Sequence, residues 1–459
     1  MQSPAAYNLT GRNNRDSRWL NPATLIAVIL LLAIFEGALR KWVFASNPTL
    51  GYLTYFAKDF LFFYAGYLGL RRTPLYDMSW IALCAALILV PSAGATLISS
   101  NPVGVFLSLR AYLLIPICAF LAASLIRGFR DIEHCALLIA VAAMGVALLG
   151  AYQYWLPPSH VLNRYAGGDA EVLHIVAEAG HVRATGTFAY ISGMAMLAGL
   201  AAWAGAVLAL PLSGRAPWKQ FLGTGSLGAS FVCSATAMTR GGLMFLIVIV
   251  IGSSLLYFRP RQVVSFTIAI LLLSPFLISS GEQLGEGVDE ETSTLMTGLN
   301  ERLSREGVFV DRVTFVLQNF YFGVSRHPLG EGLGNGQPGS RYMSGDATKP
   351  YESEWGRIAF EIGPIGLATV LLMRLAVVRR LWQCLARARD DSTRLVMACS
   401  LPYFGIMSLG WMAFNHTGNT FSWCVASLSL AAAANYGCRA ASKAGFAIAN
   451  PYGSLEIRS

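Results

Sequence analysis

Charged residues are scarce in this sequence. Only 13% of its 459 residues are Asp, Glu, Lys or Arg, whereas a soluble domain carries about 25%. Hydrophobic residues make up 55%, the mean hydropathy is +0.52, and no stretch between the apolar runs is long enough to form a separate soluble domain. This balance excludes an ordinary soluble protein and predicts an all-α integral membrane protein.

Several chemical motifs are also absent. No Cys pair has C-x-x-C spacing and no His pair has H-x-x-x-H spacing, so we predict no bound metal. The run "GEGLGNG" lacks the Lys-Ser/Thr of a P-loop and predicts a tight turn. The net charge of +9 comes with no nucleic-acid motif, and we predict neither a cofactor nor a nucleic-acid partner. The eight cysteines lie in or beside apolar runs, which predicts small core residues: Cys84, Cys118, Cys135, Cys233, Cys384, Cys399, Cys424 and Cys438.

Apolar runs long enough to cross a bilayer recur along the chain. The first run continues into Glu36 without a small-residue cleavage site, which predicts a retained helix and no cleaved signal peptide. We predict cytoplasmic tails at 1–21 and 438–459, transmembrane helices within 22–280 and 356–437, and one long outer loop with amphipathic helices at 281–355. The twelve predicted helices are 22–39, 50–70, 79–98, 103–126, 132–155, 186–210, 220–237, 241–258, 262–280, 356–378, 393–412 and 419–437.

The orientation follows from the basic residues. Cytoplasmic loops of membrane proteins carry an excess of Lys and Arg. If the tail with Arg12, Arg15 and Arg18 is inside, every second connection that follows is also inside, and each of these contains Lys or Arg. Both termini are therefore predicted to be cytoplasmic.

Many cations fall on the opposite side, against this rule. They are Arg40, Lys41, Lys58, Arg110, Arg164, Arg183, Arg240, Arg302, Arg305, Arg312, Arg326, Arg341, Lys349 and Arg357. Ionisable groups inside a membrane are costly, and they mark functional sites unless they form structural ion pairs. Two such pairs are the alternative to a functional role here: Lys58 with Asp59, and Glu36 with Arg40 at i, i+4.

Five of these outer cations would form a basic rim. A planar guanidinium matches phosphate oxygens in pairs, so such a rim suits a ligand with phosphate groups. Arg240 stands in "SATAMTRGGLMF", at the mouth of a tight turn between two apolar helices. Solvated loop residues are the alternative for Arg302, Arg305, Arg341 and Lys349. The predicted rim consists of Arg40, Lys41, Arg183, Arg240 and Arg312.

Four segments, in this order, resemble the O-antigen ligase and O-antigen polymerase family of bacterial membrane glycosyltransferases. They are "RATGTFAYISGMAMLAGLAAW", "TAMTRGGLMFLIV", "DRVTFVLQNFYFGVSRHPLGEGLGNG" and "ESEWGRIAFEIGPIGL". The layout is also similar to that family: about twelve helices, both termini inside, and one long outer loop before the last three helices.

The resemblance implies a fold, a reaction and a place. It implies a GT-C-like, metal-independent transferase in the bacterial inner membrane, with a periplasmic active site and a glycan donor carried by undecaprenyl pyrophosphate. Outer arginines bind the pyrophosphate in the family, and the matching positions are Arg183, Arg240 and Arg312. Arg40 and Lys41 would help to meet the same head group. Fixed cations would stabilise the charge that grows on the leaving group.

The general base is left open by the sequence. The family shows a His-Asn about nine residues before the acidic residue of the last segment, and Glu352 stands here in place of that His, with Ser353 and Glu354 beside it. A buried carboxylate can accept the proton of the acceptor hydroxyl. His416 in "FNHTGN" is the other candidate. The catalytic candidates are therefore Glu352, Glu354 and His416.

Three functions are compatible with the sequence. The first is an envelope polysaccharide polymerase, which moves a lipid-linked glycan (O-antigen or exopolysaccharide) to the sugar hydroxyl of an acceptor glycan. The second is a ligase that uses lipid A core or protein as the acceptor. The third is a transporter or a lipid-linked glycan flippase, since twelve helices with inside termini is also a transporter layout. Transporters place charge at the bilayer midplane between related halves, whereas this sequence gathers charge at one face and has unlike halves.

Overall fold

The structure, a computed structural model, describes most of the predicted helical regions. The described residues are 22–70, 102–165, 182–258, 321, 325, 329–335, 354–409, 412 and 415–448, and the side chains of a few of them, including Arg240 and residues 435–448, are not described. Within these ranges the chain is helical and has no β-strand.

Ten of the twelve predicted helices coincide with observed helices. The predictions at 79–98 and 262–280 lie outside the described residues. Of the observed helices, α4, η2 and α5 join into one continuous helix. The elements are α1 (Pro22–Ala38), the π-helix η1 (Leu39–Val43), α2 (Pro48–Leu70), α4 (Pro102–Leu109), the π-helix η2 (Arg110–Leu114), α5 (Ile115–Ala123), α6 (Phe129–Trp155), the 3₁₀-helix η3 (Val161–Asn163), α7 (Ile191–Ala209), α8 (Pro217–Thr236), α9 (Arg240–Tyr257), α14 (Glu354–Arg387), α15 (Asp391–Ser408) and α16 (His416–Ile448).

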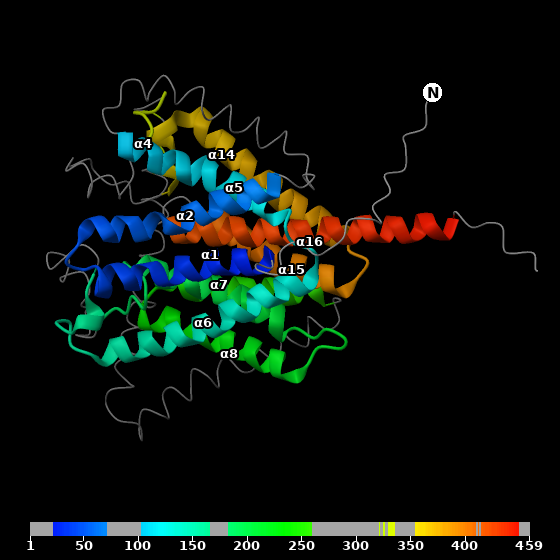
Figure 1. Cartoon of the computed structure of the whole chain (residues 1–459), viewed down its shortest axis with the longest axis horizontal. Helices are drawn as coiled ribbons and strands as arrows, with labels where there is room; N and C mark the ends of the chain where they lie inside the picture. Colours follow the sequence, from blue (N-terminus) through cyan, green and yellow to red (C-terminus); the bar gives the residue numbers. More distant parts are fainter. Residues whose placement is uncertain are drawn as a thin grey trace, which may run out of the picture.

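Four of these helices are long and apolar enough to span a membrane. They are the continuous helix Gly104–Ala123 together with Phe129–Trp155, Ile191–Ala209 and Glu354–Arg387. The helices run side by side along the long axis of the molecule (Figure 1). This arrangement fits a multi-pass membrane protein, because a helix bonds most of the backbone N–H and C=O groups of a span within itself.

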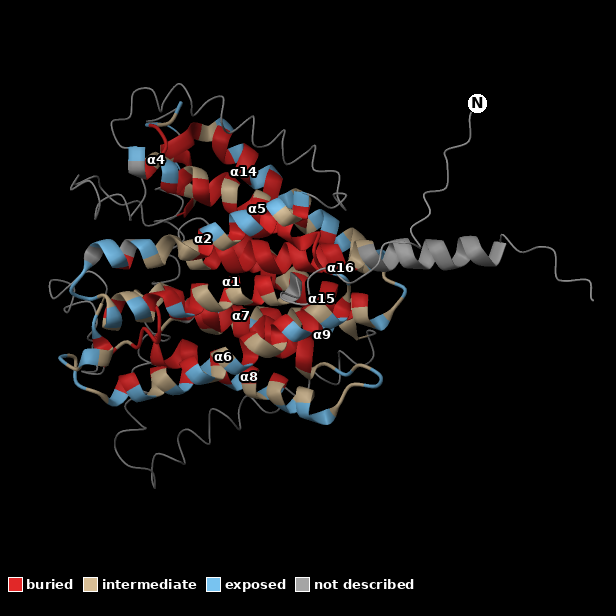
Figure 2. Cartoon of the chain, viewed as in Figure 1, coloured by how far each residue is buried: buried red, intermediate tan, exposed pale blue. Residues whose placement is uncertain are grey.

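Helix α7 lies at the centre of the bundle, and nearly all of its residues are buried (Figure 2). Its Gly and Ala residues allow neighbouring helices to approach closely, which is how membrane helices associate. Ser226 and Ser230 of α8 donate hydrogen bonds to the carbonyls of Ala201 and Ala198 in α7, at 2.8 and 2.7 Å. The indole N–H of Trp203 donates to Ser400 of α15 at 2.9 Å.

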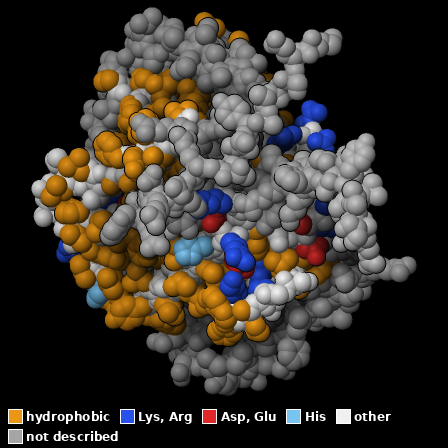
Figure 3. Space-filling view, turned by 45° about the vertical axis from the view of Figure 1, so that its right-hand side comes forward, with side chains coloured by type: hydrophobic (Ala, Val, Ile, Leu, Met, Phe, Trp, Pro, Cys, Tyr) orange, Lys and Arg blue, Asp and Glu red, His pale blue; other side chains and the backbone are white. Residues whose placement is uncertain are grey.

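The right-hand end of the bundle carries exposed cations. The α7–α8 and α14–α15 connections and the end of α16 lie at the right of Figure 1, whereas the α1–α2 connection lies at the left. We call these the right-hand and left-hand ends. Figure 3 brings the right-hand side forward and shows Lys and Arg side chains gathered there beside acidic ones. The exposed arginines of the connections and helix ends predicted to be cytoplasmic include Arg127, Arg130, Arg379, Arg380, Arg387 and Arg389.

Helix α14 is longer than predicted and is kinked. It continues to Arg387, where 356–378 was predicted, because its last turns are rich in Arg and Leu, which are good helix formers. Gly363 has a φ of 68° and a ψ of 179°, and Pro364 follows it. Proline has no N–H to bond the carbonyl four residues earlier, so it breaks the hydrogen-bond ladder at Phe360.

Candidate functional site

The glycine-rich run after His327 supplies hydrogen-bond donors to the kink in α14. The N–H of Glu331 donates to the Phe360 carbonyl at 2.7 Å, and the N–H of Gly332 donates to the Glu361 carbonyl at 3.1 Å. A side chain at Gly330 would collide with the backbone of Glu361 and Gly363. The turn predicted from "GEGLGNG" is therefore present, and it brings two of the four family-like segments into contact.

The first and second family-like segments also meet. Residues 182–188, which we call the Arg183 segment, lie against the turn between α8 and α9. The Nε of Arg183 donates to the carbonyl of Ala237 at 3.3 Å, and the N–H of Ala184 donates to the carbonyl of Thr236 at 3.0 Å. This turn places Met238 at a φ of 50°, a conformation that is uncommon for residues other than glycine. Arg240 is the first residue of α9, directly after the turn, as its sequence context predicted.

Lys41 holds the Arg183 segment in place. Its ammonium is buried and donates to the Thr185 hydroxyl and to the Gly186 carbonyl, both at 2.8 Å. On the other side, the Gln153 side chain accepts from the Gly186 N–H at 2.7 Å and donates to the Gly186 carbonyl at 3.2 Å. Lys41 was predicted to be part of a phosphate-binding rim, and in the structure its ammonium instead bonds Thr185 and the Gly186 backbone.

Gly37 of α1 permits this close contact. A Cβ at that position would lie 2.5 Å from the Ala189 nitrogen and from the Thr187 carbonyl oxygen, both backbone atoms that cannot turn away. We expect Gly37→Ala to lower the free energy of unfolding by about 1–3 kcal/mol, the usual range for overpacking, measured by thermal unfolding of the purified protein.

The matched control for Gly37→Ala is Gly145→Ala in α6. A Cβ at Gly145 meets nothing within 4 Å, so alanine there is expected to add about 0.5–1 kcal/mol through its better helix propensity. Equal melting temperatures for the two variants would show that α1 does not pack closely against the Arg183 segment at Gly37.

A second group of buried charges surrounds Tyr55 of α2. We call Glu36, Tyr55, Lys58, Asp59 and Arg110 the Tyr55 cluster. Lys58 pairs with Glu36 across the α1–α2 contact. Arg110 of η2 donates two hydrogen bonds. Its Nη2 donates to the Asp59 carboxylate at 3.0 Å, and its Nη1 donates to the Tyr55 hydroxyl oxygen at 2.7 Å.

The two ion pairs considered as the alternative to a functional role are replaced by pairs between helices. Lys58 and Asp59 are neighbours in the sequence, and adjacent residues on a helix do not face each other. Each therefore pairs with a different helix, Lys58 with Glu36 and Asp59 with Arg110. Arg40 lies with its guanidinium carbon 5.3 Å from the centre of the Tyr55 ring, leaving the Glu36 carboxylate to Lys58.

With Arg40 added, the cations around the Tyr55 cluster outnumber its carboxylates. The centre of the Tyr55 ring lies 4.4 Å from the Lys58 ammonium and 4.7 Å from the Arg110 guanidinium, and Arg40 approaches it as well. Glu36 and Asp59 supply only two carboxylates to these three cations. Arg40 is half-buried, which makes it the cation of this group that is best placed to meet an anion from outside.

His416 lies at the edge of the Tyr55 cluster. It is the first residue of α16, and the centres of its ring and the Tyr55 ring are 5.9 Å apart, edge to face. Its Nδ1 is buried and has no hydrogen-bond partner among the described residues. One turn later, the Asn419 amide donates to the Ala111 carbonyl in η2 at 2.8 Å. The bulged turn of η2 is thus bonded to the same helix that presents His416.

A third group lies on the other face of η2, around Glu361. Ser108 and Tyr112 each donate a hydroxyl to the Glu361 carboxylate at 2.9 Å. The Arg357 Nε is 4.0 Å from the same carboxylate, and both side chains are fully buried. Nearby, Glu354 is buried and paired with Arg374, so this catalytic candidate already has a cationic partner.

The structure therefore shows contacts for some of the predicted site residues, whereas others lie outside the described residues. Lys41 and Arg183 meet at the Arg183 segment, and Arg40 and His416 both contact the Tyr55 ring. Arg240 directly follows the α8–α9 turn that the Arg183 segment contacts. Glu352 and Arg312 lie outside the described residues, as does most of the predicted loop 281–355.

Sequence reasoning missed several residues of these groups. Tyr55 and Gln153 were not singled out, although a lone polar side chain in an apolar helix is itself a signal. The two π-helices were missed as well, and such bulges often occur at functional sites. They hold Arg40 and Lys41 in η1, and Arg110 and Tyr112 in η2.

A comparison of the chain with protein-family models finds no match, and a comparison with curated proteins finds none either. The family resemblance rests on the four quoted segments and on the predicted layout of the chain.

Proposed function

We propose that this protein is a membrane glycosyltransferase that polymerises an envelope polysaccharide outside the cytoplasmic membrane. The donor would be a glycan on undecaprenyl pyrophosphate, and the acceptor a sugar hydroxyl of a second glycan. The proposal rests on two contacts between family-like segments. The Arg183 segment contacts the turn before Arg240, and the run at 330–334 contacts the kink of α14.

The reaction assigns a role to each group. The acceptor oxygen attacks the anomeric carbon, the bond from that carbon to the pyrophosphate oxygen breaks, and the acceptor proton passes to a base. Undecaprenyl pyrophosphate leaves with its charge met by Arg183, Arg240 and Arg312. Positively charged groups that are already in position stabilise such a leaving group without reorganisation.

His416 is the base that we favour among the three candidates. Its Nδ1 has no partner in the described part of the chain, whereas Glu354 is engaged by Arg374. A base must reach the proton it abstracts, and a nitrogen without a partner is available for that contact. Glu352 remains the candidate from its spacing to Glu361 in the family-like segment.

Two other functions stay in competition. A ligase differs only in its acceptor, lipid A core or protein, and the Glu at the family's His position favours the polymerase over it. A lipid-linked glycan flippase has one feature in its favour, the break in α14 at Gly363 and Pro364, since transporters often carry discontinuous helices at their binding sites.

The test replaces Arg183, Arg240 or Arg312 with alanine in cells that make the polymer. Each loss removes a charge-assisted contact worth about 1.5–3 kcal/mol, so polymer is expected to fall about 10- to 150-fold. Lipid-linked single units should accumulate at the outer face of the membrane. Arg389→Ala, an exposed arginine at the opposite end, serves as the control and should leave polymer unchanged. Accumulation at the inner face alone would identify a flippase instead.

A further inference from the structure

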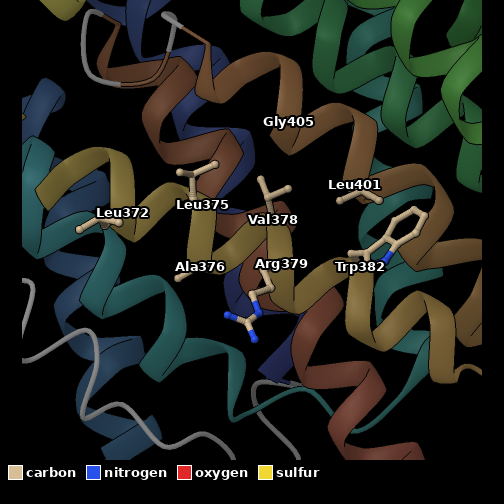
Figure 4. Close-up of a pocket in the computed structure, with 8 residues that line it drawn as sticks. All are labelled: Leu372, Leu375, Ala376, Val378, Arg379, Trp382, Leu401 and Gly405. Carbon is tan, nitrogen blue, oxygen red and sulfur yellow. The ribbon is translucent and has the colours of Figure 1, made fainter. Parts of the chain in front are cut away.

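A groove runs along the outside of the bundle between α14 and α15, at the right-hand end. It has a cavity volume of about 740 Å³ (Figure 4). Six of its lining residues carry no charged or hydrogen-bonding side chain: Leu372, Leu375, Ala376, Val378, Leu401 and Gly405. Only Arg379 and Trp382 contribute polar side-chain atoms to it.

The length of the groove matches one leaflet. On α14 it extends from Leu372 to Trp382, which at 1.5 Å per residue is about 15 Å. The hydrocarbon core of a bilayer is about 30 Å thick, so the groove covers about half of it. Leu372, Leu375 and Trp382 are 54–62% exposed in the described structure, which leaves room for an apolar chain to lie against them.

Arg379 supplies the charge at one end of this groove. Its side chain is exposed and has no hydrogen bond or ion pair within the described ranges, whereas the next residue, Arg380, reaches Gln383 at 3.5 Å. Trp382, close to Arg379 in the lining, is of the type found at membrane interfaces. An arginine beside an apolar groove, at the membrane face where basic residues gather, complements an anionic lipid head group.

We propose that this groove binds one acyl chain of an anionic phospholipid from the leaflet at the right-hand end, the one predicted to be cytoplasmic, with the lipid phosphate at Arg379. The site lies at the end of α14 opposite Glu354 and the kink, so the proposal does not depend on glycosyl transfer. Gly405 leaves the groove open on the α15 side, because a Cβ there meets nothing within 4 Å and a larger side chain would narrow the groove.

The test is native mass spectrometry of the purified full chain, titrated with phosphatidylglycerol and with phosphatidylcholine of identical acyl chains. We expect the wild type to retain phosphatidylglycerol in preference, and Arg379→Gln to weaken that binding about tenfold, to the level of phosphatidylcholine. Arg380→Gln, the matched control, should change it less than about twofold. Gly405→Leu should weaken binding of both lipids while the melting temperature holds or rises, since Leu is the better helix former.

Four results would overturn the proposal. The first is a wild type that retains neither lipid, as expected if another segment of the chain fills the groove. The second is equal binding of the two lipids by the wild type. The third is an equal loss in Arg379→Gln and Arg380→Gln. The fourth is release of the lipid by millimolar inorganic phosphate, which would make Arg379 a site for free phosphate.

Discussion

Replacing Arg110 with methionine is expected to lower the free energy of unfolding by about 3–5 kcal/mol, the cost of removing one partner of a buried ion pair. Arg110 is 1% exposed and bonds both Asp59 and the Tyr55 hydroxyl. Methionine fills a similar volume but leaves the buried Asp59 carboxylate without its cation. The measurement is unfolding of the purified protein in detergent, followed by heat and by titration with a denaturing detergent.

The double variant Arg110→Met with Asp59→Leu separates charge from packing. Replacing both members of a buried pair by apolar residues is often neutral, so most of the lost stability should return. Polymer formation should stay low in the double variant, because the guanidinium beside Tyr55 and His416 is still missing. A single variant as stable as the wild type would contradict the observed pairing of α2 with η2.

Replacing Arg374 with methionine is expected to cost a similar 3–5 kcal/mol. Arg374 pairs with the buried Glu354 and donates to the Ser408 carbonyl at 2.9 Å. Its loss leaves a carboxylate that is only 3% exposed without a cation. Arg380→Met, on the exposed face of the same helix, is the control and should change stability by no more than about 0.5 kcal/mol.

A double variant of the Arg374–Glu354 pair tests whether Glu354 or His416 is the general base. We expect Arg374→Met with Glu354→Leu to regain both stability and polymer formation, because the pair would then be structural and His416 would remain. A stable double variant that forms no polymer would instead assign the base to Glu354. The readout is polymer length on a gel, compared at equal protein abundance.

The helices were predictable from the sequence because each apolar run must bond its own backbone in the membrane. Runs such as 132–155 and 241–258 therefore lie within a few residues of α6 and α9. The end of α14 was not predictable from hydropathy, because Arg379 and Arg380 mark the end of an apolar run without ending the helix. Its break at Gly363 was readable in principle from the following proline.

The candidate site was harder to predict because its contacts join distant parts of the chain. Arg110 was identified as a costly charge within an apolar run, but the sequence around it does not indicate that Tyr55 and Asp59 are its partners. The pair of Lys58 with Glu36 depends on how α1 and α2 face each other. Lys41 was identified as an outward cation, and only the fold shows that its ammonium is bonded to Thr185 and Gly186.

The kink of α14 has a consequence for how this chain enters the bilayer during synthesis. The carbonyls of Phe360 and Glu361 find N–H partners about thirty residues earlier, at Glu331 and Gly332. An unbonded carbonyl is costly in lipid. The first turns of α14 are therefore fully hydrogen-bonded only when the glycine-rich run lies against them. We expect the seating of this helix in a bilayer to depend on the folding of the segment before it.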